Sequence, residues 1–332
     1  MNDLPTFASP TFSGVMLAAA RIASHAYVTP VLRSRSLDAL AGCELYFKCE
    51  NLQRTGAFKF RGACNAVFAL SQPQADVGVV TQSSGNHGAA IALACRLRGI
   101  PASVVVPHGA PAIKLAAIEG YGARIIRCEP NMRARDAAAA ALLVETGATL
   151  IHPFDNNDVI AGQGTAAMEL LRECESLDAV LTPVGGGGLL SGTAIAAHGL
   201  RDDIAVWGAE PAGAADAHAS LQQNRCITDM TATTICDGLR GHLAPRTLAI
   251  LREYASGILL VEDPGIVQAM RLIWERLKIV VEPSAATALA AVFANRDHFA
   301  GRRVGIVLSG GNVDLGAIPA MLSLAMDQVP HG

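Results

Sequence analysis

The sequence predicts an α/β protein with mainly parallel, twisted sheets and helices on both faces of each sheet. The chain has 332 residues, enough for a sizeable core and more typical of two domains than of one. Although 51% of the residues are hydrophobic, only 5% are aromatic, so the apolar content is mostly Ala, Val, Ile and Leu. That mixture is typical of buried strands and their covering helices. Strand-like and helix-like runs alternate in both halves, which favours right-handed crossovers between parallel strands.

The first series of elements forms a compact unit. Short runs rich in β-branched residues predict strands, and apolar residues at helical spacing predict helices. The predicted strands are 77–82, 102–107, 123–128 and 149–152, and the predicted helices between them are 87–98, 111–119 and 132–146.

A second series follows the first. It comprises a helix at 160–175, a strand at 179–184, a helix at 189–199, a strand at 204–209, helices at 264–278 and 284–294, and a strand at 304–309. The uncharged stretch 179–200 is long enough to span a bilayer, but Pro183 and the glycines at 185–188 break it into strand, loop and helix. Segment 211–245 mixes Gly, Pro, Thr and charged residues and predicts a long surface excursion.

Charge and cysteine content exclude several classes of function. The formal net charge is -3 and the arginines are scattered, so the electrostatic signature of a nucleic-acid or anionic-membrane partner is missing and small-molecule partners are expected. The eight cysteines contain no C-x-x-C pair, and the histidines do not cluster, which disfavours zinc and redox sites. The N-terminal segment does not have the pattern of a secretory signal, so a cytoplasmic location is expected.

Lys59 is the most informative single residue. It is one of only four lysines, and it lies between Phe58 and Phe60. Desolvation by the two rings would disfavour the ammonium form, lower the lysine pKa and expose the lone pair that an imine requires. The alternative is a structural lysine that extends its ammonium to solvent from the edge of a strand.

The loop after strand 77–82 gathers polar groups at the start of a helix. Ser83, Ser84, Asn86 and His87 follow the strand directly. Ligands of parallel sheets bind beyond the carboxyl ends of the strands, and helix N-termini bind carboxylate or phosphate. We therefore expect a carboxylate site here, with an ordinary helix cap as the alternative.

Two further loops follow strands of the second series. The glycines at 185–188 would let backbone amides close around a phosphate, although a tight turn would need glycines as well. Ser309 places a hydroxyl at the end of strand 304–309, where a helix cap is the alternative. An imine-forming lysine, a phosphate site, a carboxylate site and a neutral hydroxyl are together what pyridoxal phosphate uses.

These residues lie in motifs that resemble the fold-type II pyridoxal-phosphate enzymes, which have a tryptophan synthase β-like fold, and within them the serine racemase and serine/threonine dehydratase family. The motifs are TGAFKFRGA at 55–63, SSGNHG at 83–88, AGQGT at 161–165, GGGGL at 185–189, EPSAATA at 282–288 and LSGGNVD at 308–314. They follow the family's order over nearly the whole chain. The resemblance implies a large cofactor-binding domain, 1–77 and 154–332, and a small mobile domain, 78–153, that binds the substrate carboxylate.

The resemblance also implies roles for individual residues. Lys59 would be the catalytic Schiff-base lysine, Phe58 would lie under the pyridine ring and Asn86 would bond the ring hydroxyl. Ser309 would face the pyridine nitrogen, and Gly185, Gly186, Gly187 and Gly188 would hold the phosphate. Unlike a carboxylate, the Ser309 hydroxyl would not keep the ring nitrogen protonated, so the cofactor would stabilise a substrate carbanion less strongly. Loss of the β-substituent of the substrate would then compete well with other reactions of the carbanion.

The implied reaction is removal of water from a small L-β-hydroxy-α-amino acid, namely serine, threonine or 3-hydroxyaspartate, to give a keto acid and ammonia. Ser83, Asn86 and His87 would seat the substrate carboxylate. Ser84 corresponds to the racemase serine that works on the opposite face of Cα, so the alternative is a serine or aspartate racemase with dehydratase side activity. Arg135 corresponds to a residue near the distal end of the substrate, where it would bind a second carboxylate, unless it is a helix-surface charge like Arg133.

A divalent cation and a homodimer complete the implied picture. Glu210, Ala214 and Asp216 have the racemase spacing for Mg²⁺, with Ca²⁺ or Mn²⁺ as alternatives. Taken without the resemblance, an acidic pair in a polar loop is usually solvated.

The sequence departs from the mammalian racemases at two positions. Phe154 stands where they carry a polar residue near the cofactor, and Ala89 replaces a glutamine of their nucleotide site, although Tyr121, Arg276 and Lys278 still match that site. Activation by ATP is therefore not expected. Little chain follows Asp314, so the regulatory domain of biosynthetic threonine dehydratases is not expected either.

Two other functions are disfavoured. A β-replacing sulfhydrylase usually carries a Thr-Gly-Asn-Thr type of loop in place of the SSGNHG motif at 83–88. A non-catalytic sensor would need a damaged site, and the motifs are intact.

Overall fold

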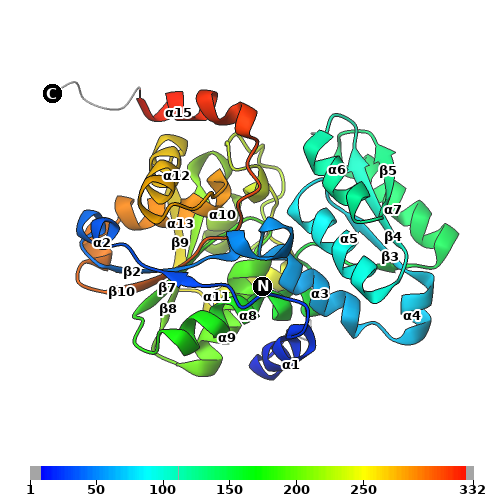
Figure 1. The fold of residues 1–332 in the computed structure, drawn as a ribbon, viewed down its shortest axis with the longest axis horizontal. Helices are drawn as coiled ribbons and strands as arrows, with labels where there is room; N and C mark the ends of the chain where they lie inside the picture. Colours follow the sequence, from blue (N-terminus) through cyan, green and yellow to red (C-terminus); the bar gives the residue numbers. More distant parts are fainter. Residues whose placement is uncertain (1–8, 111, 327–332) are drawn as a thin grey trace.

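The computed structural model describes residues 9–110 and 112–326, which form two lobes, each built on its own sheet (Figure 1). The larger sheet has the strand order β1-β2-β10-β7-β8-β9, and the smaller has the order β5-β4-β3-β6. All pairings are parallel except that of β1 with β2. The predicted α/β class with mainly parallel sheets is therefore confirmed.

The strands of the larger sheet are β1 Val31–Leu32, β2 Glu44–Lys48, β7 Ala179–Pro183, β8 Ala205–Pro211, β9 Gly257–Val261 and β10 Arg303–Val307. Those of the smaller sheet are β3 Val79–Gln82, β4 Ala102–Pro107, β5 Arg124–Cys128 and β6 Thr149–Leu150. Every residue of β7 is buried, as expected for a central parallel strand covered on both faces.

Helices cover both faces of the larger sheet (Figure 1). One face packs against α2 Arg35–Ala41, α12 Asp263–Leu277 and α13 Pro283–Ala294, and the other against α8 Asn157–Glu173, α9 Gly188–Leu200 and α11 Pro245–Tyr254. The remaining helices of this lobe are α1 Phe12–Ile22, α3 Lys59–Ala69, α10 Asp216–Gln223, α14 Arg296–Phe299 and α15 Ile318–Met326. Short 3₁₀ turns are η1 Glu50–Leu52, η2 Arg54–Gly56, η3 Ala212–Ala214, η4 Asp237–Leu239 and η5 Leu315–Ala317.

The smaller lobe carries α4 Gln72–Val77, α5 Asn86–Arg98, α6 Ala112–Gly120 and α7 Met132–Thr146. The predicted start of the second helix, at 111, lies outside the described residues. The prediction of a strand from residue 77 is wrong, because Ser71 and Gln74 form a capping box that starts a short helix and Val77 ends it. The strand itself begins at Val79.

The prediction of a surface excursion over 211–245 is correct only in part, because residues 222–225 and 228–231 are exposed but other parts of the segment are buried. This segment contains η3, α10 and η4, and its side chains Ala217, Cys236 and Leu243 are buried. Thr234 donates a hydrogen bond to Asp263 Oδ1 at 2.6 Å, which ties the segment to the start of α12. Isolated apolar residues anchor it at intervals, so its polar composition concealed its burial.

The stretch 179–200 forms β7, a glycine loop and α9, as predicted. None of the helices within 9–110 and 112–326 is long and apolar enough to cross a bilayer.

Candidate active site

Lys59 begins α3, so the strand-edge alternative for this residue is wrong. Its ammonium Nζ donates to the backbone oxygen of Pro153 at 3.1 Å and lies 5.1 Å from the centre of the Phe58 ring. Burial lowers the pKa of Lys59 to about 8. A larger fraction of the amine is therefore neutral near physiological pH than for an exposed lysine, as imine formation requires.

The segment before α3 is joined to the end of β10. The Phe58 amide donates to the Ser309 carbonyl at 2.9 Å, and Gly311 donates to the Gly56 carbonyl at 2.9 Å. Ala57 and Gly310 form an isolated antiparallel bridge between these two hydrogen bonds. Ser309, which is buried, is therefore fixed beside the turn that carries Lys59.

A buried ionic network that sequence reasoning missed holds α3 in place. Arg61 Nε lies 2.7 Å from Glu50 Oε2, and Arg61 Nη1 lies 2.6 Å from Glu169 Oε1. Lys48 adds a second cation, with Nζ 2.7 Å from Glu169 Oε2. Burial disfavours the Arg61 charge, yet Glu50 and Glu169 raise the Arg61 pKa above its ordinary value. Arg61 is two residues from Lys59, so this network fixes the first turn of the helix.

The glycine loop leads from β7 into α9. Gly187 has a φ of 84°, a left-handed conformation that favours glycine, and a Cβ on Gly186 would lie 2.3 Å from the Phe154 ring. Phe154 therefore forms one wall of the loop. The backbone amides at this helix start are suited to an anion such as phosphate, and side chains on the loop would not fit.

The SSGNHG loop leads from β3 into α5 in the smaller lobe. Ser83 Oγ accepts a hydrogen bond from the Gly85 amide at 3.2 Å, and Ser84 beside it is half-buried. His87 is buried, and its Nδ1 has no hydrogen-bond partner among the described residues. Burial, with a contribution from Lys59, lowers the His87 pKa well below its ordinary value. The loop therefore presents a hydroxyl and a neutral imidazole to a ligand.

Asn86 is the point at which the two lobes meet at the site. Its Nδ2 donates to Glu282 Oε1 at 2.9 Å, and its Oδ1 accepts from Asn312 Nδ2 at 2.9 Å. Glu282 is buried, and burial followed by the nearby Asp237 raises its pKa to about 8. Glu282 and Asn312 lie in the motifs at 282–288 and 308–314, but no role was predicted for either residue. The signal in the sequence was an acidic residue, Glu282, directly before the apolar run that forms α13.

The lysine, the glycine loop and the polar loop thus provide an amine, an anion site and a second polar site. Residues 22–310 match the model of a family described as pyridoxal-phosphate dependent enzymes. The chain belongs to this family. Its fold is that of the fold-type II members.

Known proteins resemble this pyridoxal-phosphate enzyme over nearly its full length. A serine racemase of Dictyostelium discoideum is 48% identical over 320 residues, covering 95% of this chain and 99% of that protein. An L-threo-3-hydroxyaspartate ammonia-lyase of Saccharomyces cerevisiae is 46% identical over 315 residues, covering 95% of this chain and 97% of that protein. The structure of maize serine racemase has a TM-score of 0.92 at 42% identity and covers 96% of this chain and 98% of that one.

Arg135 lies in the first turn of α7 of this pyridoxal-phosphate enzyme, after the carboxyl end of β5. Its side chain is half-buried, and its Nε is buried without a hydrogen-bond partner in the described part of the chain. Arg133, by contrast, is exposed. Asp136, which follows Arg135 on α7, acts electrostatically on His152, which precedes Pro153, the residue whose carbonyl contacts Lys59. Arg135 is therefore a partly buried cation available to an anion.

The three residues expected to bind a metal lie at the carboxyl end of β8 and in the turn that follows. The Glu210 oxygens accept from the amides of Ala217 and His218, both at 2.8 Å. Asp216 Oδ2 is buried, and its neighbour is His242 Nδ1 at 3.4 Å, a residue that sequence reasoning missed. Burial raises the Glu210 pKa to about 8 and also raises that of Asp216.

No group of three or more His, Cys, Asp and Glu side chains forms a metal-ligand cluster within the described residues. The expected set has only two carboxylates, Glu210 and Asp216, with the Ala214 carbonyl as its third ligand. The two carboxyl groups are buried, and a divalent cation bound between them would stabilise their ionised forms. Asp216 Oδ2, whose contact with His242 Nδ1 is long at 3.4 Å, therefore fits such an ion.

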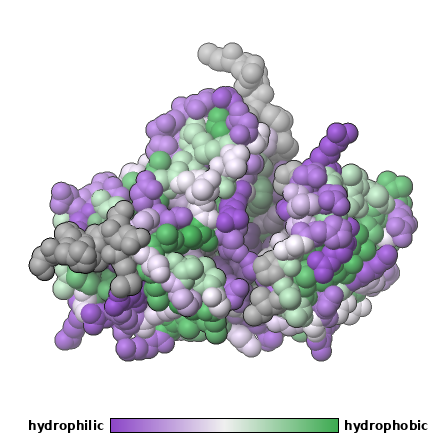
Figure 2. Space-filling view, turned by 90° about the horizontal axis from the view of Figure 1, so that it is seen from above, coloured by the Kyte–Doolittle hydropathy of each residue, from purple (hydrophilic) through white to green (hydrophobic). Residues whose placement is uncertain are grey.

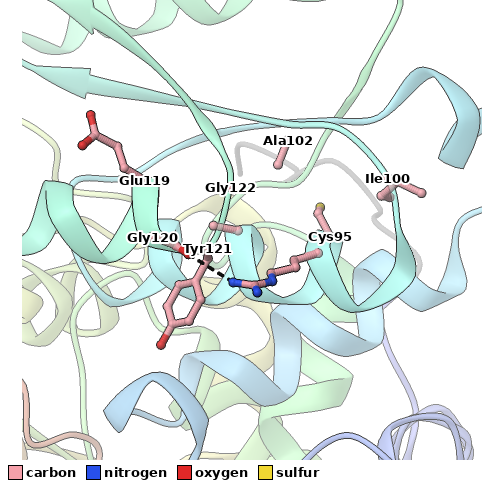
Figure 3. Close-up of a pocket in the computed structure, with 9 residues that line it drawn as sticks. Cys95, Ile100, Ala102, Glu119, Gly120, Tyr121 and Gly122 are labelled. Carbon is pink, nitrogen blue, oxygen red and sulfur yellow. Dashed lines mark hydrogen bonds between the residues drawn. The ribbon is translucent and has the colours of Figure 1, made fainter.

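A separate cavity of about 260 Å³ lies between α5, the end of α6 and the start of β4 (Figure 3). Arg96 Nη1 donates to the Gly120 carbonyl across it at 3.1 Å. Tyr121, one of the residues that match the racemase nucleotide site, lines this cavity and packs on an apolar cluster that includes Ala89. The lining contains none of the predicted cofactor or substrate residues.

Proposed function

We propose that the protein is a pyridoxal-phosphate dependent ammonia-lyase that eliminates water from a small L-β-hydroxy-α-amino acid, releasing a keto acid and ammonia. The observation that carries this proposal is the hydrogen bond between Phe58 and Ser309. It sets a serine, in place of a carboxylate, beside the lysine of the site. The cofactor, when bound, supplies an electron sink for the carbanion. A serine hydroxyl as partner of the pyridine nitrogen would make this electron sink weaker than a carboxylate partner would. Loss of the β-hydroxyl of the substrate is favoured as a result.

Each part of the site would have its own role in this reaction. Lys59, with a pKa of about 8, would bind the cofactor and take the proton from Cα. Phe58 would lie under the ring, Asn86 would bond its hydroxyl, and the glycines at 185–188 would hold its phosphate. Ser83, Asn86 and His87 would orient the substrate carboxylate.

Among the β-hydroxy amino acids, we propose 3-hydroxyaspartate as the preferred substrate over serine and threonine. The unpartnered Nε of Arg135 supports this choice, because a second carboxylate would supply an anionic acceptor there. The similarity to the hydroxyaspartate ammonia-lyase of Saccharomyces cerevisiae agrees with it.

Racemisation of serine or aspartate is the second candidate, favoured by comparable similarity to the serine racemases. Ser84 would then exchange a proton on the face of Cα opposite Lys59. We expect Ser84→Ala to lower formation of the D-amino acid by at least about 10²-fold, the loss typical of a missing acid or base, with much less effect on keto-acid release. Chiral chromatography alongside a keto-acid assay measures both. Equal losses in the two rates would argue against a racemase role for Ser84.

We further propose that Glu210, Ala214 and Asp216 bind one divalent cation, with Mg²⁺ preferred over Ca²⁺ or Mn²⁺. Its binding would stabilise the ionised forms of two buried carboxyl groups, and so would stabilise the fold. Removal of metal by a chelator is therefore expected to lower the unfolding temperature by several degrees, and added Mg²⁺ is expected to restore it. The variant Asp216→Asn should lose this response. An unfolding temperature that chelator and Mg²⁺ leave unchanged would contradict the site.

The domain boundaries, oligomeric state and location are also proposals. We expect the small domain predicted at 78–153, together with α4 of the same lobe, to move as one unit against the larger lobe, which hydrogen exchange with and without substrate would test. A homodimer, which the family resemblance implies, is testable by sedimentation. A cytoplasmic enzyme with a small amino-acid substrate fits the composition, and cell fractionation would test the location.

A further inference from the structure

Lys114 and Asp237 form an ion pair between the two lobes. Lys114 lies on α6 of the smaller lobe, and Asp237 begins η4 of the larger lobe, 123 residues further along the chain. Seen from above, a furrow separates the two lobes (Figure 2). The contact therefore crosses the division between the lobes.

Each partner is connected to a different half of the candidate active site. On the larger lobe, Leu239 of η4 lies against the glycine loop, since a Cβ on Gly185 would be 3.0 Å from its Cα. On the smaller lobe, Ile118 of α6 packs in one apolar cluster with Ala89 of α5, the helix that Asn86 begins. The ion pair thus joins the element beside the phosphate site to the element beside the carboxylate site.

The two charges also act on the residue that holds Asn86. Burial is the main cause of the raised Glu282 pKa, Asp237 raises it further, and Lys114 lowers it. Both charges therefore lie near the hydrogen bond from Asn86 Nδ2 to Glu282 Oε1.

We propose that Lys114 and Asp237 are positioning residues, whose ion pair holds the SSGNHG loop against the glycine loop and Lys59 while substrate is bound. This inference rests on the proposed function, because it assigns the pair to the substrate-bound arrangement of the same site. The side chains of Lys114 and Asp237 are 27% and 47% exposed, so solvent weakens the pair. A contact of this strength can break and re-form in each catalytic cycle.

The experiment compares Lys114→Gln, Asp237→Asn and the exchanged pair Lys114→Glu with Asp237→Lys, all as holoenzyme. In the two single variants, amides of 112–120 and 237–239 are expected to exchange hydrogen about two- to fivefold faster, the range for an exposed ion pair. KM for the amino acid should rise by a similar factor with kcat nearly unchanged. The exchanged pair should return both quantities toward wild type. Arg271→Gln, which breaks the exposed Arg271–Glu275 pair on α12, is the matched control and should change neither.

Wild-type exchange rates in the single variants, or an exchanged pair no better than either of them, would overturn the proposal. Faster exchange with an unchanged KM would also overturn it, since the contact would then be structural only. If the wild-type protein releases no keto acid, the proposed function fails on its own, and hydrogen exchange alone decides whether the ion pair holds the lobes together.

Discussion

Replacing Lys59 by alanine is expected to abolish keto-acid release, with a fall in kcat of about 10⁴-fold, the upper range for a lost acid or base. The same change should remove the visible absorbance of covalently bound cofactor. Both effects follow from one amine, because Lys59 begins α3 at the site and has a pKa lowered to about 8 by burial. Absorbance spectra and steady-state kinetics of the purified variant measure them.

The variant Lys59→Arg keeps the positive charge at this position but removes the nucleophilic amine. Arginine keeps a positive charge but stays protonated and cannot attack the cofactor aldehyde, so we expect the same loss as for alanine. Wild-type circular dichroism would establish that both variants fold. A Lys59→Ala protein that keeps the visible absorbance would contradict the assignment of Lys59.

Replacing Arg135 by alanine is expected to lower kcat/KM for 3-hydroxyaspartate by about 10²- to 10³-fold, the usual loss when one partner of a buried charge pair is truncated. The reason is that Arg135 presents a buried Nε that lacks a protein partner. Serine has no second carboxylate, so kcat/KM for serine should change far less. Parallel kinetics on the two substrates measure this difference.

Arg133→Ala is the matched control for Arg135→Ala. It removes the same charge from the same helix, two residues away, at an exposed position. The control should leave kcat/KM for both substrates near wild type. Equal losses for serine and 3-hydroxyaspartate in Arg135→Ala would mean that this arginine has a structural role and does not read the distal carboxylate.

Patterns within short stretches of sequence predicted the helices and strands that depend mainly on neighbouring residues. β7, its glycine loop and α9 were predicted because a short apolar run, four glycines and a helical run follow one another within 179–200. The buried part of segment 211–245 was missed because its burial depends on distant partners, such as Asp263 for Thr234. Composition within a segment carries no information about such partners.

The residues of the candidate site also fall into those that local patterns predicted and those that depend on distant partners. Ser83 and Ser309 were predicted because each directly follows a strand and ligands of parallel sheets bind beyond the carboxyl ends of the strands, although β3 and β10 belong to different sheets. The partners of Arg61 and Asn86 were not predicted. Glu169 lies 108 residues from Arg61, and Glu282 lies 196 residues from Asn86. A lone charged residue in an apolar run signals that a partner exists, but it does not identify that partner.

The most direct test is simultaneous measurement of keto acid, ammonia and D-amino acid when cofactor-loaded protein is mixed with 3-hydroxyaspartate, serine or threonine. Elimination predicts keto acid and ammonia in equal amounts, with the highest kcat/KM for 3-hydroxyaspartate. Formation of D-amino acid without keto acid, or no turnover of any of these substrates by cofactor-loaded protein, would contradict the proposed dehydratase.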